Sequence, residues 1–365
     1  MGAGSLSLNA QADGALEPRT AEQLLVDVQQ AKPQPLSGVV ETTANLGLPA
    51  LPKASGPHGV SSADPMAALT GTNTFRVWVG GHTQQKVAWV MNRAEVSVTH
   101  NGPDVWVWDS TKKTAQHLVL PSHDAKPDKS AHPTPSGMPS TPAEAAEQVL
   151  QRLDPSTNVT VDKQVSVAGR AAYELVLTPR SDATRVKAAR IAIDGQTKLP
   201  LRVQVLSKTI DEPALSVGFT SVAFTQPPAS VFDFSPAAGV EVTTTKVPKA
   251  SPDEVRRALE QAKAKHEGTA TPKLIEGRPT VVGEGWDAIT TGRTGALKDL
   301  AAQAPTGEDG KPTQSPLDLL PTRTGAWGSA KVLDGTLVSL VVTEDGRFAV
   351  GAVSVDALLA ALPAK

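Results

Sequence analysis

The chain has 365 residues, a formal net charge of −2 and no cysteine. This length accommodates two domains, and a near-neutral charge without Lys/Arg runs excludes a polyanion-binding surface. The absence of cysteine excludes disulfides, thiolate metal sites, a cysteine nucleophile and a lipid-modified cysteine. No stretch reaches the roughly 18–20 continuous apolar residues of a membrane span, and the first residues lack the pattern of a signal peptide.

The N-terminal part predicts one short helix followed by a run of strands. Thr20 and Gln23 have the spacing of a helix capping box, and Pro33 and Pro35 end that helix. From Gly38 the apolar period changes from 3.6 to 2, which predicts strands. These strands cover residues 38–48, 75–79, 86–91, 95–99, 105–108 and 115–120. Between the fourth and fifth of them, Asn101-Gly102 predicts a hairpin turn.

The middle of the chain predicts a loop, a helix and a second run of strands. Residues 121–142 are rich in Pro, Ser, Lys and His, which predicts a mobile loop or lid. It ends at Thr141 and Glu144, which have capping-box spacing and begin a helix with one apolar face. Strands follow at residues 159–167, 171–178, 186–193, 201–207 and 215–224, with a hairpin turn at Asp194-Gly195.

The C-terminal part predicts a smaller α+β unit. Ser251 and Glu254 have capping-box spacing, which predicts a helix after residue 251. Strands are predicted at residues 279–283, 337–342 and 348–353, and helices at 295–302 and 355–362. We therefore expect a domain over residues 18–248 and a C-terminal extension or subdomain over residues 251–365, with a boundary near residue 250.

Motifs of catalytic and metal sites are absent from the sequence. The seven histidines lack metal-ligand spacing. There is no Walker A motif, no dinucleotide-binding glycine pattern and no G-x-S-x-G elbow. The S-x-x-K match at Ser110 lies in a predicted hairpin turn without its partner motifs. We expect no enzyme, no cofactor and no metal.

Tryptophan placement is the unusual feature. Trp78, Trp89, Trp106 and Trp108 lie on neighbouring predicted strands, and Val105–Trp108 is apolar at every position. Because an antiparallel sheet with one solvated face alternates apolar and polar residues, something covers both faces here. One interpretation is a sheet between helices. The other is a concave sheet that lines an apolar cavity, with helices as a lid.

Four stretches, taken in order, resemble a known family. They are Phe75–Val79, Val98–Asp109 (which contains the hairpin Asn101-Gly102), Tyr173–Pro179, and Ile193–Val203 together with Phe232–Pro236. Over residues 20–245 the chain resembles the LolA-like periplasmic lipoprotein carriers and their relatives, including the lipoprotein-sorting proteins of actinobacteria. Its Ala/Pro/Thr-rich composition suits a high-GC actinobacterium. The resemblance implies an α+β, mainly β fold, an unclosed antiparallel β-barrel covered by helices.

The resemblance also implies a function. Such a protein is extracytoplasmic, in the cell envelope, and holds lipid or lipoprotein acyl chains in an apolar cavity; we expect any signal or anchor to precede residue 1. The candidate cavity residues are Val77, Val79, Trp89, Trp106, Leu118, Tyr173, Leu175, Ile191, Val203 and Phe219. A functional arginine of the Gram-negative carriers has no counterpart here, because the chain reads Gly80-Gly81.

A second hypothesis follows from the extra C-terminal length. Two-domain relatives of the RseB/MucB type bind an anti-sigma factor and sense envelope lipids. An envelope sensor of this kind needs a docking surface for a partner protein, which we place on residues 250–365. Trp286 and Trp327 are either hot spots of that surface or core anchors of a small domain. No nucleic-acid partner is expected.

Overall fold

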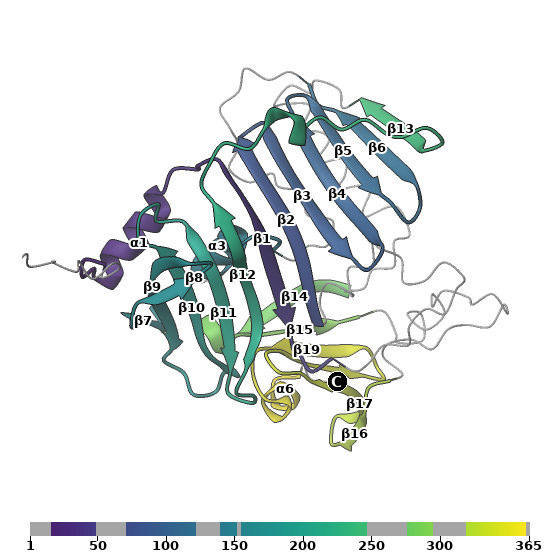
Figure 1. Ribbon diagram of the computed structural model, residues 1–365. Coiled ribbons are helices and arrows are strands. Elements are labelled where there is room, and N and C mark those ends of the chain that lie inside the picture. The colour runs from purple at the N-terminus through teal and green to yellow at the C-terminus, as the bar shows by residue number, and fades with distance from the viewer. Residues whose placement is uncertain are drawn as a thin grey trace, which may run out of the picture.

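The computed structural model describes residues 16–48, 71–121, 139–151, 155–246, 276–294 and 319–362. These residues form a 13-stranded sheet and a 6-stranded sheet (Figure 1). The larger sheet bends but does not close, because its order runs from an edge at β13 to an edge at β7. The predicted fold class, mainly β with an unclosed sheet and a few helices, is confirmed.

The large sheet is antiparallel except at one edge. In spatial order its strands are β13 (Glu241–Lys246), β6 (Thr114–Val119), β5 (Asp104–Asp109), β4 (Ala94–Asn101), β3 (Gln84–Met91), β2 (Gly71–Gly81), β1 (Leu36–Ala44), β12 (Pro213–Ala223), β11 (Pro200–Ser207), β10 (Val186–Asp194), β9 (Arg170–Pro179) and β7 (Thr157–Val161), with β8 (Val165–Val167) also on β9. β13 pairs with β6 in parallel. We call β1 and β7–β12 the inner half and β2–β6 the outer half.

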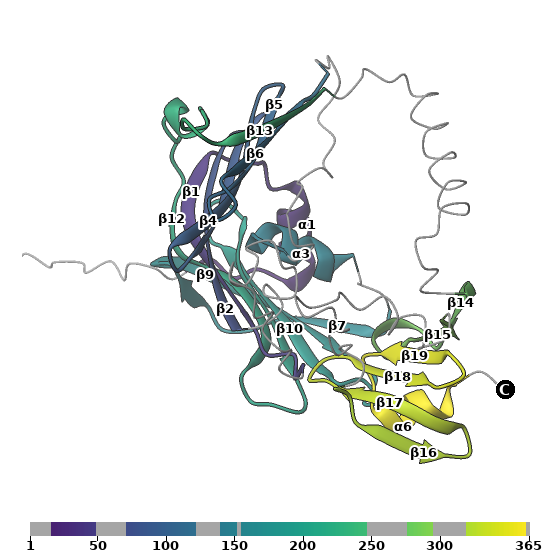
Figure 2. The same ribbon diagram turned by 90° about the vertical axis from the view of Figure 1, so that its right-hand side faces the viewer.

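Two helices lie on the concave side of this sheet (Figure 2). α1 (Ala21–Gln30) has the predicted capping box, since Thr20 Oγ1 accepts from the Gln23 N–H at 3.2 Å and Gln23 Oε1 accepts from the Thr20 N–H at 3.0 Å. α3 (Pro142–Leu150) begins at Thr141 as predicted, but its capping box is incomplete. Glu144 accepts from the Ser140 N–H at 2.8 Å instead of returning to Thr141.

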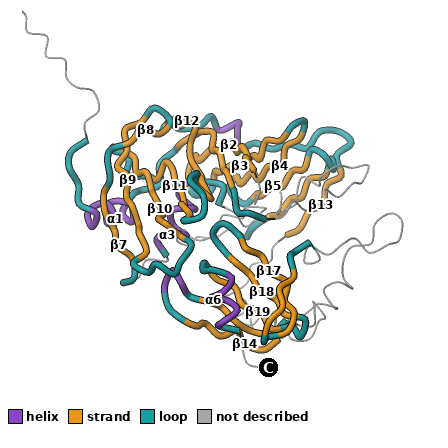
Figure 3. Tube along the Cα trace, turned by 90° about the horizontal axis from the view of Figure 1, so that it is seen from below, coloured by secondary structure: helices purple, strands orange, loops and turns teal. Residues whose placement is uncertain are grey.

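The second sheet is smaller and carries one helix (Figure 3). Its order is β14 (Glu276–Val282), β15 (Ile289–Arg293), β19 (Arg347–Gly351), β18 (Ser339–Thr343), β17 (Gly328–Asp334) and β16 (Thr322–Gly325). The last helix, α6 (Val355–Ala360), was predicted and buries Val355, Leu358 and Leu359 against it. β15, β16 and β17 were not predicted: β15 and β16 are short Thr- and Gly-containing segments, and β17 has only two buried apolar residues, Ala330 and Val332.

Several predicted features fall outside the described residues. They are most of the lid at 121–142, the helix after Ser251, the helix at 295–302 and the domain boundary near residue 250. The division into residues 18–248 and 251–365 therefore stays a prediction, although one sheet lies wholly before it and the other wholly after it.

Arg185 joins the two sheets. It lies before β10, and its guanidinium donates to the carbonyl of Val353 at 2.9 Å and to the carbonyl of Gly335 at 3.1 Å, and pairs with Asp334. Ser207 Oγ of β11 donates to the Thr336 carbonyl at 2.7 Å, and the Thr336 N–H donates to the Leu46 carbonyl at 2.9 Å. The second sheet is thus fixed to the inner half by several polar contacts.

We predict that Arg185→Ala lowers the free energy of unfolding by about 2–3 kcal/mol, because it leaves two carbonyls at the junction without their donor. Asp334→Asn is the matched control: the Asp334 side chain is 55 % exposed, so its loss of charge should cost less than about 1 kcal/mol. Urea denaturation of both variants measures this. Equal losses would show that the ion pair, rather than the carbonyl contacts, holds the junction.

The predicted turn at Asp194-Gly195 is held by a buried carboxylate. Asp194 is 1 % exposed and accepts from Arg170 Nε at 2.6 Å and from the Thr197 N–H at 2.7 Å. Burial raises the pKa of Asp194, but the hydrogen bonds from Arg170 and Thr197 outweigh burial and hold this pKa below its ordinary value.

Because the pKa of Asp194 is lowered in the folded chain, its contribution to stability is complete above the ordinary carboxyl pKa of about 4. That contribution is lost as the pH falls through the lower folded value. We predict that Asp194→Asn is less stable than the parent at neutral pH and loses less stability on acidification. Urea midpoints measured between about pH 5 and about pH 2 test this. Parallel pH curves for the two proteins would contradict it.

Candidate ligand-binding face

The concave face of the large sheet is defined by strand register. Residues paired across neighbouring strands point to the same side. Val40 pairs with Phe75 on β2 and with Phe219 on β12, and from these pairs the register carries across the whole sheet. α3 marks this side as concave, since its Ala145 and Ala146 pack in the same cluster as Val203 and Val217.

Register places nine of the ten predicted cavity residues on this concave face. They are Val77, Val79, Trp89, Leu118, Tyr173, Leu175, Ile191, Val203 and Phe219. Trp106 is the exception. It pairs with Thr99 and His117 and points to the convex side, so the prediction for Trp106 is corrected. In a strand that is apolar at every position, periodicity does not decide which residues face inward.

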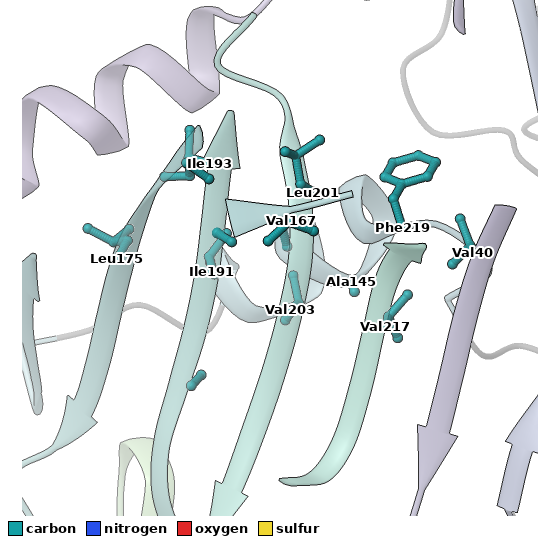
Figure 4. Close-up of a cluster of buried hydrophobic side chains, with 14 of the residues drawn as sticks. Val40, Ala145, Val167, Leu175, Ile191, Ile193, Leu201, Val203, Val217 and Phe219 are labelled. Atoms are coloured by element: carbon teal, nitrogen blue, oxygen red, sulfur yellow. The ribbon is translucent and has the colours of Figure 1, made fainter. Parts of the chain in front are cut away.

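In the inner half the concave face is a packed core (Figure 4). Leu175 and Ile191 are 0 % exposed and Val203 is 2 % exposed. Figure 4 shows Val217 and Phe219 from β12 beside Ala145 of α3. Tyr173 packs at one end of this core, and its hydroxyl donates to the Glu17 carbonyl at 2.8 Å, which ties the chain before α1 to the sheet. This half stabilises the fold.

In the outer half the same face is less covered. Val77, Val87, Val98 and Val107 stand in register on four neighbouring strands; we call these four residues the valine row. Val77 is buried, whereas the other three are half-buried, as are Val79 and Leu118. Val96 and Val105, which flank the row on the same face, are buried. Phe75 and Trp89 stack beside the row with ring centroids 6.0 Å apart. The outer half therefore presents apolar side chains that helices α1 and α3 do not bury.

Charged side chains are almost absent from the concave face of β2–β6. The register places one there, Asp109, which accepts from the Thr111 N–H at 2.9 Å and the Lys112 N–H at 3.1 Å and so caps its own turn. His100, on the same face, contacts the Gly102 carbonyl through Nε2 at 2.9 Å. Such a surface suits hydrocarbon, because it offers a bound ion no partner.

The convex face of the outer half is covered by the chain itself. After β12, residues 225–240 cross β2–β6, and we call them the strap. Phe232 is 1 % exposed and packs on Gly80. Phe234 contacts Trp106 at 5.2 Å and Trp108 at 6.1 Å between ring centroids. In the described part of the chain, it is the strap that covers this second apolar side. The aromatic pair at i and i+2 in Phe232-Asp233-Phe234 was the available signal for the strap.

His117 stacks on Trp106 under the strap, with centroids 4.0 Å apart and planes 2° apart, and contacts Asp104 at 2.7 Å. Trp78, also convex, lies 5.7 Å from the Lys86 ammonium. Three of the four tryptophans on neighbouring strands, Trp78, Trp106 and Trp108, therefore lie on the convex face. Only Trp89 is left for the concave face.

Trp286 and Trp327 are core anchors in the structure. Trp286 packs against the apolar cluster of the inner half and donates through Nε1 to Thr157 Oγ1 at 2.7 Å. Trp327 packs against the core between the second sheet and α6. Both are half-buried, so the interpretation as packing residues accounts for their contacts.

The described ranges carry neither a cluster of metal ligands nor a long apolar helix. There, no three His, Asp or Glu side chains gather closely enough to hold a metal ion. Likewise, among the helices of those ranges, none has the length and apolar character needed to cross a bilayer.

Comparison with known proteins gives structural similarity only. No family model and no curated protein matches the chain. Among solved structures, MucB of Pseudomonas aeruginosa in complex with MucA is 14% identical, covers 93% of this chain and 96% of its own, and has a TM-score of 0.40. A LolA superfamily protein from Nitrosomonas europaea is 11% identical, with 60% and 99% coverage and a TM-score of 0.21.

A third solved structure, an uncharacterized conserved protein from Thermus thermophilus, is 11% identical over 62% of this chain and 99% of its own, with a TM-score of 0.33. The predicted resemblance to LolA-like and MucB-type proteins is thus confirmed as a similarity of structure. At these TM-scores it says nothing about ligand or partner.

The two halves of the concave face should respond differently to truncation. We predict that Ile191→Ala, in the packed inner half, lowers the free energy of unfolding by about 2–5 kcal/mol. Val107→Ala removes a half-buried side chain and should cost about 1 kcal/mol or less. Equilibrium urea unfolding measures both. A cost at Val107 as large as that at Ile191 would show that the outer half is also packed core.

Proposed function

We propose that this chain is an extracytoplasmic binding protein that sequesters acyl chains of a lipid or lipoprotein on the outer half of its concave face. The observation that carries the proposal is the nearly uncharged apolar face at the valine row, where Val87, Val98 and Val107 are half-buried. Removing hydrocarbon from water contributes about 0.8 kcal/mol per CH₂ group. Binding of this kind needs no catalytic group, so we propose a carrier or chaperone of the cell envelope and not an enzyme.

The location follows from the sequence resemblance. The four stretches that resemble those of lipoprotein-sorting proteins support a cell-envelope protein of actinobacterial type. Such a protein meets lipids at a membrane surface, and acyl chains are the part of a lipid that an uncharged concave sheet accommodates.

A second candidate is an envelope sensor that binds a partner protein, such as an anti-sigma factor. The observation that favours it lies on β14, at an edge of the second sheet. Val281 is 60% exposed and Val282 is 46% exposed, and neighbouring apolar residues on an edge strand are a typical place for another chain to pack. This candidate uses a different surface, so the two functions are separable by mutation.

We predict that Val98→Lys abolishes binding of a fluorescent fatty acid, because it places an ammonium group in the middle of the valine row. Val90→Lys is the matched control: Val90 is also half-buried but points to the convex side, opposite Glu95. It should bind like the parent. Circular dichroism and thermal unfolding confirm that both variants fold.

Native mass spectrometry with organic extraction identifies anything that the parent protein carries. A folded parent that binds neither fatty acid nor phospholipid would overturn the acyl-chain proposal. In that case β14 becomes the surface to test, with Val281→Lys as the variant.

A further inference from the structure

We infer that a bound acyl chain lies across the strands along the valine row, with its methyl end at Val77 and its polar head at β6. This rests on the proposed function and adds the position and direction of the ligand. Strand register carries the argument, together with the way burial changes along the row.

The valine row is straight and continuous. Val77 pairs with Val87, Val87 with Val98, and Val98 with Val107, so one β-branched side chain stands on each of four adjacent strands. Adjacent strands lie about 4.8 Å apart, so the row is about 14 Å long. That length suits the terminal half of a long acyl chain lying across the sheet.

The inner end of the row is closed. The next register partner is Gly38 on β1, which has no side chain. A Cβ at Gly38 would lie 2.9 Å from two ring carbons of Phe219 and 2.5 Å from the Ser221 carbonyl oxygen, so the Phe219 ring occupies that space. Val77, beside it, is 1% exposed. A chain that enters along the row therefore stops against Val77 and Phe219.

The outer end of the row is open and polar. Beyond Val107 the register partner is Gln116 on β6, which is exposed. Burial decreases from Val77 to the half-buried Val87, Val98 and Val107, and polarity appears only at Gln116. Burying a polar head group without hydrogen-bond partners costs free energy. The head group therefore belongs at the Gln116 end and the methyl group at the closed end.

One side of the row supports the same direction. The stacked Phe75 and Trp89 flank it at β2 and β3, near the closed end, and supply apolar contact there. On the other side, Gln85 and His100 flank Val87 and Val98, and Val105 and Leu118 flank Val107 and Gln116, so the direction rests on the first side and on burial along the row. Trp89 is the one tryptophan on the concave face of the outer half, so it reports on whatever part of the chain lies near the closed end.

Fluorescence quenching by brominated palmitic acid tests the direction, because bromine quenches indole emission only at close contact. With the bromine on the terminal carbon, we expect a larger loss of tryptophan fluorescence than with the bromine beside the carboxylate. Trp89→Phe should remove this difference, whereas Trp106→Phe, on the convex side, should leave it unchanged. Phe keeps an aromatic ring in the stack with Phe75, and the affinity of each variant for unlabelled palmitic acid is measured so that quenching is compared at equal occupancy.

The outcomes separate this inference from the proposed function. Stronger quenching by the label beside the carboxylate, or equal quenching by both labels, would overturn the direction while leaving acyl binding intact. A difference that survives in Trp89→Phe would overturn the position along the valine row. Failure of the parent protein to bind either fatty acid would overturn the proposed function itself.

Discussion

An unclosed sheet with apolar side chains on both faces is stable only if both faces are shielded from water, and in this chain a different segment shields each face. On the concave side, α1 and α3 cover the inner half. On the convex side of the outer half, Phe232 and Phe234 of the strap cover the apolar side chains. The concave side of the outer half is left less covered. The candidate site is thus the part of the sheet for which the helices provide no packing partner.

Much of the fold was predictable because local signals were strong. The caps at Thr20 and Thr141 and the turns at Asn101-Gly102 and Asp194-Gly195 have chemistry that depends on a few neighbouring residues. The strands of the first sheet were placed by their period. These signals fix where elements begin and end, and they need no knowledge of long-range packing.

The site was predictable only in part, because it depends on register and on distant segments. Val107 and Trp106 are neighbours in the apolar segment Val105–Trp108, and only pairing with Val98 and Thr99 shows which one faces inward. The closed end depends on Phe219, about 180 residues from Gly38 along the chain. The strap depends on β13 returning to β6. No local pattern carries these relations.

The attachment of the second sheet has a mechanical consequence. Arg185, Ser207 and Leu46 all belong to the inner half or its turns, and Trp286 adds a further bond to β7. These contacts stiffen the inner half along its junction with the second sheet. The outer half is joined to the inner half through the hydrogen-bonded ladder between β1 and β2, so it is supported along one side. Bending of the outer half would change the curvature of the sheet at the valine row and leave the inner half undisturbed.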